Sequence, residues 1–286
     1  MNLAALVEYD GTRFAGFQRQ APDKGPTVQG TIEAALQRIA GEAIAIEGAG
    51  RTDSGVHATG QVFNAHVPAR LDAPAWQRAL NALLPEDVAI RATCVAPDDF
   101  RARYSATSRS YRYRILCDAA RAPLRERYAW RVPHRLDVAA MSEAAALLLG
   151  EHDFGAFGSS PRDRRDGERG HTVRTMLAAR CGWAPRRAAS DGDEGEGEGD
   201  GPPDEVELHF TANAFLTGMV RRLVGTLALV GAGRLTAADF GAILAAADKR
   251  HPGAAAPARG LCLTGVAYPA GLLTWASERP AATGFI

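Results

Sequence analysis

The sequence has few of the residues that build metal sites and disulfide frameworks. Its 286 residues include only four cysteines, at positions 94, 117, 181 and 262, and none has Cys-x-x-Cys spacing or a histidine at ligand spacing. Four widely separated thiols argue against a zinc site and against a disulfide scaffold. We therefore expect free, buried cysteines and no metal ion.

Long hydrophobic runs are missing as well. Arg or Gly interrupts each apolar stretch well before the ~20 residues that a membrane span requires. The first residues, MNLAALVE, carry neither a basic leader nor a cleavage site. These features predict a cytoplasmic protein without a membrane segment. A hydrophobic content of 46% is sufficient for one large folded domain or two medium ones.

Lysine is scarce, and almost all of the positive charge is arginine. The formal net charge is zero, from 33 basic and 33 acidic residues. However, eight of the acids lie in residues 191–205, DGDEGEGEGDGPPDE, which contain no base. Without them 25 acids face 33 bases, so the folded part is predicted to be moderately basic. An arginine excess suits contacts with phosphate, although a compositional bias explains it equally well.

Common nucleotide-binding motifs are also absent. No G-x-x-x-x-G-K-[ST] string occurs anywhere in the chain. Gly48-x-Gly50 is followed by Asp53 at the position where a dinucleotide fingerprint requires a third glycine. The sequence therefore predicts no cofactor of the nucleotide type.

Apolar periodicity in residues 1–104 predicts a β-α-β-β-α-β order. Strands are expected where apolar residues run together or alternate, at residues 3–9, 44–48, 61–67 and 88–94. Helical spacing runs from Val28 to Ile39, with Thr27 as N-cap and Gly41 just after the end, and a second helix surrounds Trp76. This order is typical of a ferredoxin-like lobe.

Residues 105–286 repeat the same order. Expected elements are strands near 111–115, 172–180, 205–211 and 261–268, and helices near 138–149, 215–227 and from Thr236. We therefore expect an α/β (α+β) fold of two ferredoxin-like, RRM-like lobes, 1–104 and 105–286, with largely antiparallel sheets and an active-site cleft between them. The acidic, glycine-rich stretch at about 188–204 is expected to be a surface loop inserted in the second lobe.

One glycine-rich loop concentrates residues that carry chemistry. Residues 48–61, GAGRTDSGVHATGQ, place Arg51, Asp53 and His57 among four glycines. A guanidinium close to a carboxylate keeps the carboxylate ionised, which suits a nucleophile. An Asx turn with a surface salt bridge is the alternative interpretation. The Asp-Ser-Gly string at Asp53 also matches the aspartic-protease triplet, but the chain lacks the second Asp-[Ser/Thr]-Gly that this chemistry needs.

The same loop resembles the active-site motif of the TruA-type tRNA pseudouridine synthases. Further blocks that are similar to this family follow in family order along nearly the whole chain. They lie at residues 9–20, 27–30, 97–106, 110–113, 152–154, 213–221 and 260–263. A single short match arises by chance, but this many matches in order make the resemblance specific.

The resemblance implies a cofactor-independent isomerase that converts uridine to pseudouridine in the anticodon stem-loop of tRNA, at RNA positions 38 to 40. It also implies a homodimer that binds tRNA across both subunits. Asp53 is implied as the nucleophile, with attack on C1′ or on C6 left open. Arg51 is implied to keep that carboxylate ionised and to fill the gap left by the flipped nucleotide. The resemblance implies that Tyr111 stacks on the extruded uracil and accepts the C5 proton, and that Arg221, favoured over its neighbour Arg222, pairs with Asp53.

Further substrate contacts are expected from Arg19, Gln20, His57 and Arg112. A non-catalytic RNA-binding protein on the same scaffold, with a merely structural Asp53, is the alternative function. The chain departs from the family pattern at Gly218, which is expected to weaken the entry of the long second-lobe helix by ~1 kcal/mol relative to Ala.

Overall fold

The chain forms two compact units, Met1–Tyr111 with Cys262–Ile286, and Arg112–Leu261. The computed structural model describes residues 1–159, 171–185, 204–247 and 253–275. The division falls at Tyr111 rather than at the expected residue 104, and the end of the chain joins the first unit rather than the second. The reason is strand pairing, because Cys262 and Leu263 pair in parallel with residues 57 and 58 of the first unit.

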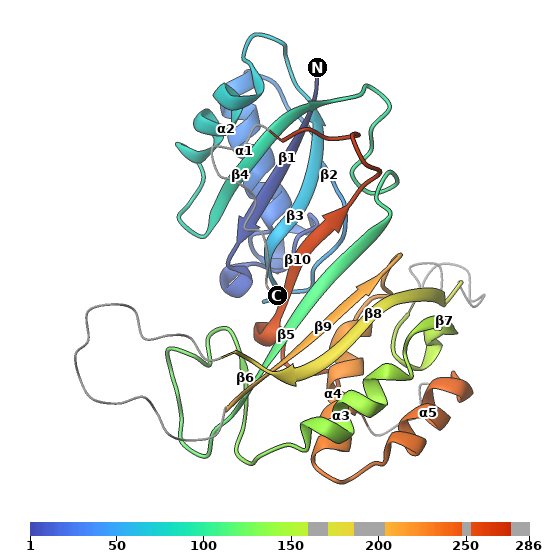
Figure 1. Cartoon of the computed structure of the whole chain (residues 1–286). Helices are drawn as coiled ribbons and strands as arrows, with labels where there is room; N and C mark the ends of the chain where they lie inside the picture. Colours follow the sequence, from blue (N-terminus) through green and yellow to red (C-terminus); the bar gives the residue numbers. More distant parts are fainter. Residues whose placement is uncertain (160–170, 186–203, 248–252, 276–286) are drawn as a thin grey trace. The chain divides into compact units, whose positions relative to one another are not determined.

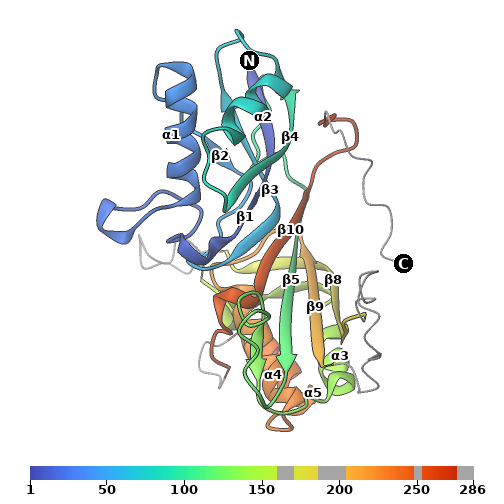
Figure 2. The same cartoon turned by 90° about the vertical axis from the view of Figure 1, so that its left-hand side faces the viewer.

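The first unit has the expected β-α-β-β-α-β order followed by the returning last strand. Its elements are β1 (Asn2–Tyr9), α1 (Val28–Ala40), β2 (Glu47–Gly48), β3 (His57–His66), α2 (Ala73–Asn81), β4 (Val88–Ala96) and β10 (Leu261–Ala267). β1 pairs antiparallel with both β3 and β4, while β2 and β10 pair with β3. Both helices lie on one face of these strands (Figures 1 and 2).

Local capping explains where the first helix begins and ends. The Thr27 hydroxyl accepts a hydrogen bond from the Gly30 amide at 3.2 Å, which satisfies one of the amides left open at a helix start. Gly41 ends the helix in the left-handed region, with φ of 82°. Ile32 and Leu36 lie between these caps and are fully buried against the strands. The sequence expectation for this helix is confirmed.

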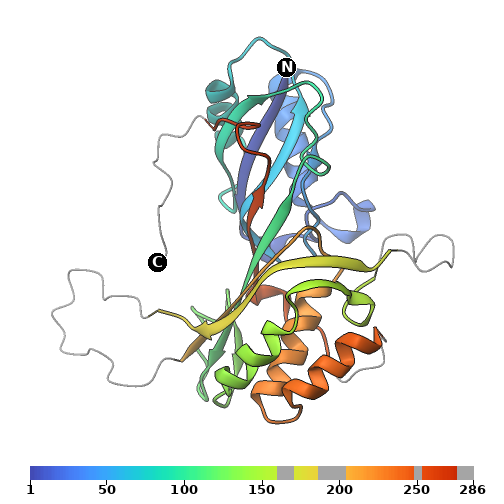
Figure 3. The same ribbon diagram turned by 45° about the vertical axis from the view of Figure 1, so that its right-hand side comes forward.

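The second unit contains the remaining elements. They are β5 (Ser108–Cys117, which begins in the first unit), β6 (Trp130–Val132), α3 (Val138–Ala146), β7 (Gly150–Asp153), β8 (Val173–Trp183), β9 (Glu205–Ala212), α4 (Met219–Gly231) and α5 (Ala237–Ala246). The strand order is β5-β9-β8-β7, and β6 pairs in parallel with β5. Figure 3 shows α3, α4 and α5 gathered on one face of these strands.

Several expected boundaries are wrong in detail. Only Glu47–Gly48 of the expected strand at 44–48 pairs, although Ile44 and Ile46 are buried. β3 begins at His57 rather than at residue 61, so residues 57–61 at the end of the chemistry-bearing loop are strand. The helix expected to reach residue 149 ends at Ala146.

Gly218 does not weaken the long helix of the second unit, contrary to expectation. α4 begins only at Met219, and Gly218 is its N-cap with φ of 72°, a conformation that favours glycine. Phe215 likewise lies before the helix. Any side chain at position 218 is strained, so glycine is the residue that this turn requires.

The acidic stretch lies almost wholly outside the described residues. The prediction that it forms a surface loop therefore falls on residues that the structure does not describe. At its end, Arg125 donates hydrogen bonds of 2.6 and 2.9 Å to the two carboxylate oxygens of Asp204. Glu205 bonds to Arg114. The Arg125 guanidinium lowers the pKa of Asp204 below its usual value. These last two acids therefore belong to the ion-paired start of β9.

No helix within the described ranges is long and apolar enough to cross a membrane.

Candidate active site

The loop between β2 and β3 is held in place by backbone and hydroxyl contacts around Asp53. The Phe17 amide donates to the Thr52 carbonyl at 3.1 Å, and the Gly55 amide donates to the Phe14 carbonyl at 3.3 Å. The Thr52 hydroxyl lies 2.8 Å from the buried Tyr9 hydroxyl. Asp53 itself is half-buried. The loop therefore presents its carboxylate from a fixed backbone rather than from a free surface turn.

Gly16 permits the close approach that fixes this loop. Its φ is +106°, and a Cβ atom there would lie 2.7 Å from the Thr52 carbonyl oxygen. Any side chain would therefore both strain the backbone and push against the residue that precedes Asp53. This packing gives a physical reason for Gly16 within the family-like block at residues 9–20.

Tyr111 is a buried tyrosine in the same compact unit as the Asp53 loop. It lies in β5 and is 7% exposed. Burial raises the pKa of its hydroxyl, and the negative charge of Asp53 raises that pKa further. The phenol is therefore protonated at neutral pH. Three of the four predicted catalytic residues, Arg51, Asp53 and Tyr111, thus lie in one compact unit, and their catalytic roles stay predictions.

The two predicted catalytic arginines lie in different units and differ in their contacts. Arg51 is exposed and lies in the same loop as Asp53. Arg221 belongs to the second unit, where its Nε donates to the Ala256 carbonyl at 2.7 Å. Burial raises the pKa of Tyr113, and the positive charge of Arg221 offsets part of that rise. The pairing of Arg221 with Asp53 stays a prediction.

His57 is buried rather than open to substrate. It is 6% exposed, and its Nδ1 accepts a hydrogen bond from the Gly11 amide at 3.1 Å. The same nitrogen lies 3.1 Å from a carboxylate oxygen of Asp10. These contacts join the end of the Asp53 loop to the turn that follows β1, so the ring is placed to fix the loop.

The remaining predicted substrate contacts lie on two surfaces. Arg19 bonds to the buried Glu33, and the Gln20 amide donates to the Ala15 carbonyl at 2.6 Å. Arg19 and Gln20 also line a groove of about 540 Å³ beside α1, together with Arg38. Arg112 lies on β5, with its guanidinium 3.7 Å from Glu207. Their contact with substrate stays a prediction.

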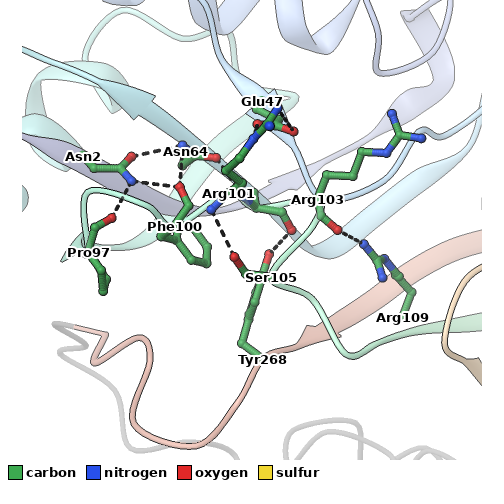
Figure 4. Close-up of polar contacts among 11 residues, drawn as sticks. Asn2, Glu47, Asn64, Pro97, Phe100, Arg101, Arg103, Ser105, Arg109 and Tyr268 are labelled. Atoms are coloured by element: carbon green, nitrogen blue, oxygen red, sulfur yellow. Dashed lines mark hydrogen bonds and ion pairs between the residues drawn. The ribbon is translucent and has the colours of Figure 1, made fainter.

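Arg109 is a residue that sequence reasoning missed. Its half-buried guanidinium donates to three backbone carbonyls, those of Ala49 at 3.0 Å, Ala106 at 3.2 Å and Arg103 at 2.5 Å (Figure 4 shows the last). Burial lowers the pKa of Arg109. The positive charge of Arg109 offsets part of the rise that burial and Asp53 cause in the pKa of Tyr111. The acceptors of Arg109 are main-chain atoms, which leave no pattern in the sequence. The one available signal is that Arg109 stands two positions before Tyr111.

We predict that Arg109→Met lowers both stability and activity. Hydrogen bonds from a charged group contribute about 1.5–3 kcal/mol each, offset in part by the desolvation of the guanidinium. A net loss of about 2 kcal/mol in the free energy of unfolding is expected from chemical denaturation. Arg109→Lys keeps the charge but cannot serve three carbonyls, so it should recover only part of the loss. Stability equal to wild type in both variants contradicts this role.

Comparison with known proteins identifies the family. A match to the family described as tRNA pseudouridine synthase covers residues 5–105 and 144–269. The chain belongs to the tRNA pseudouridine synthase family. It is 42% identical over 271 residues to the tRNA pseudouridine synthase A of Solidesulfovibrio magneticus, covering 94% of this chain and 91% of that protein. Identity to the tRNA pseudouridine synthase A of Chloroflexus aurantiacus is 44% over 276 residues, with 96% and 91% covered.

A third tRNA pseudouridine synthase A, from a Roseiflexus species, is 44% identical over 281 residues, covering 98% of this chain and 95% of that protein. The tRNA pseudouridine synthases are isomerases. Their family match contains the whole Asp53 loop and Arg221, while Tyr111 lies between its two matched ranges. Within the described ranges, no group of three or more His, Cys, Asp or Glu side chains is arranged to hold a metal ion.

Proposed function

We propose that this protein converts uridine to pseudouridine in the anticodon stem-loop of tRNA, at RNA positions 38 to 40. The observation that carries the proposal is the half-buried carboxylate of Asp53, on a loop held by main-chain hydrogen bonds. Its negative charge adds to the effect of burial in raising the pKa of Tyr111, which lies in the same unit. Membership of the tRNA pseudouridine synthase family supports the reaction class. The choice of positions 38 to 40 rests on the resemblance of the motifs.

The proposed reaction rearranges bonds within one nucleotide and requires proton transfers but no redox step. The N1–C1′ bond breaks, a C1′–C5 bond forms, the proton on C5 leaves and N1 gains a proton. No electrons are transferred and no group moves to another molecule, so the residues of the site supply the chemistry. A carboxylate serves as the nucleophile because it forms a covalent bond and later releases it. Attack of Asp53 on C1′ or on C6 fits this role.

Tyr111 is proposed to stack on the uracil and to relay a proton. Because its pKa is raised, the hydroxyl holds its own proton when the substrate binds. Such a hydroxyl accepts the C5 proton only while it passes its own proton on. The carboxylate of Asp53, freed when the covalent bond breaks, is the proposed acceptor, since its charge already acts on this phenol.

The two arginines are proposed to support the extruded nucleotide. Flipping a base out of its stack costs a few kcal/mol, which a side chain recovers in part by filling the gap. Arg51 is exposed at the loop and long enough for this role. Arg221 is proposed to pair with the Asp53 carboxylate, on the strength of the family resemblance. The same resemblance supports a homodimer, and the tRNA substrate supports a cytoplasmic location.

The direct test is conversion of an unmodified tRNA transcript with uridine at positions 38, 39 and 40. After incubation with the purified chain, nucleoside analysis is expected to show pseudouridine, and carbodiimide-dependent primer-extension stops should map it to these positions. A transcript with cytidine at all three positions is the matched control and should give none. Absence of pseudouridine in the first transcript, or equal amounts in both, contradicts the proposal.

A further inference from the structure

We propose that a tyrosine flanked by two arginines, in the turn after β4, is an additional contact for RNA outside the nucleotide that reacts. This inference rests on the proposed function, because it assumes a tRNA substrate. The three residues, Arg101, Arg103 and Tyr104, are called the Arg–Tyr platform below. The Tyr104 side chain is 65% exposed, and the guanidinium carbons of Arg101 and Arg103 lie 4.5 and 5.5 Å from its ring centre.

The chemistry of the Arg–Tyr platform matches that of a nucleotide. An exposed aromatic ring stacks on any base, since every base has a flat π face. Guanidinium groups next to that ring bind phosphate and also stack on bases. An apolar protein partner gains little from two charged groups at the centre of its contact, because burying them costs desolvation. The platform therefore favours RNA over an apolar surface.

The backbone under the Arg–Tyr platform is held by buried amide side chains, as Figure 4 shows. The Asn64 side chain accepts from the Ala102 amide at 2.8 Å and donates to the Asn2 side chain at 3.0 Å. Asn2 donates to the Phe100 carbonyl at 2.9 Å. The Tyr268 hydroxyl donates to the Ala102 carbonyl at 2.8 Å. A turn held in this way loses little conformational entropy when it binds a ligand.

The two arginines of the platform have different surroundings. Arg101 donates to both carboxylate oxygens of Glu47, at 2.9 and 3.2 Å, which fixes its guanidinium beside the Tyr104 ring. Arg103 is exposed and, among the residues that the structure describes, forms no ion pair. Figure 4 shows its side chain extending away from the anchoring contacts. Arg103 is therefore the phosphate contact, and Arg101 orients the ring.

One side chain ties the platform to the Asp53 loop. Arg109 donates both to the carbonyl of Arg103, within the platform, and to that of Ala49, at the start of the loop. All of these residues belong to the first compact unit. The separation between the platform and Asp53 is thereby fixed. RNA bound on the platform is held at a set distance from the carboxylate.

The test measures binding and turnover separately. In the Asp53→Asn background, Tyr104→Ala is expected to weaken binding of the unmodified tRNA transcript at least about fivefold, whereas Tyr104→Phe keeps the ring and binds like the parent. Arg103→Gln should reduce the slope of log affinity against log salt by about 0.7 to 0.9. With Asp53 restored, Tyr104→Ala should raise KM and leave kcat unchanged.

Tyr128→Ala is the matched control, since Tyr128 is 41% exposed and the guanidinium of Arg127 lies 5.6 Å from its ring. Its tRNA affinity should equal that of the parent. If wild type forms pseudouridine but Tyr104→Ala and Arg103→Gln keep parental affinity and salt slope, the platform proposal alone is overturned. If Tyr104→Ala changes the oligomeric state without changing affinity, the platform contacts protein and the proposal is overturned as well. Wild type without conversion overturns the proposed function first.

Discussion

Asp53→Asn is expected to lower the single-turnover rate of pseudouridine formation by on the order of 10⁴-fold or more, the scale seen when a nucleophile is removed. The amide has nearly the size of the carboxylate, so the loop held by Phe14, Phe17 and Tyr9 should keep its shape. It lacks the negative charge and forms no ester with the sugar and no adduct with the base. Rapid quenching followed by nucleoside analysis measures the rate.

Two controls separate chemistry from folding and binding. Asp53→Asn should bind unmodified tRNA with parental affinity and unfold at the wild-type temperature. Asp23→Asn changes an exposed carboxylate of the same unit and should leave the rate unaltered. A rate for Asp53→Asn within tenfold of wild type contradicts the nucleophile assignment and favours the alternative of an RNA-binding protein with a structural Asp53.

Local signals in the sequence predict the first unit well because its elements are coded by neighbouring residues. Thr27 and Gly41 cap α1 where the cap rules place them. In the second unit, the sequence did not predict β6 and β7, for two different reasons. The first has only three residues, and the exposed, polar GEHD string of the second has no apolar alternation.

The return of the last strand to the first unit follows from contacts that no local pattern carries. Cys262 pairs with His57, about two hundred positions earlier in the chain, and the alternation of residues 261–268 is equally consistent with either unit. Periodicity shows that a segment is a strand and which face is apolar. It does not name the neighbour to which that strand bonds.

The candidate site was predictable where its residues share one loop. Arg51 and Asp53 are two positions apart, so their proximity follows from the sequence alone. The family blocks added Tyr111, which lies in the same compact unit as the loop and whose role stays a prediction. The burial of His57 could not be predicted from the sequence, because a histidine between small apolar residues is found both in protein cores and on surfaces. Arg109 was missed because its partners are main-chain carbonyls.

Tyr111→Phe is expected to lower kcat at least about 100-fold while leaving KM for tRNA near the wild-type value. The ring that is proposed to stack on uracil remains, but the hydroxyl that is proposed to relay the C5 proton is gone, and such proton transfers contribute about 10²–10⁴-fold. Because the pKa of Tyr111 is raised above its usual value near 10, the phenol stays protonated from pH 6 to 9. The wild-type rate should therefore not increase over this range through ionisation of Tyr111.

Tyr113→Phe provides the matched control two positions along β5. The Tyr113 hydroxyl donates to the Pro257 carbonyl at 2.7 Å within the second unit, so its loss should reduce stability by about 1 kcal/mol and leave kcat unchanged. Tyr111→Ala removes ring and hydroxyl together and should raise KM as well as lower kcat. A Tyr111→Phe enzyme with wild-type kcat limits Tyr111 to stacking and shows that the C5 proton leaves by another path, whereas equal losses in Tyr111→Phe and Tyr113→Phe point to a general effect of strand β5.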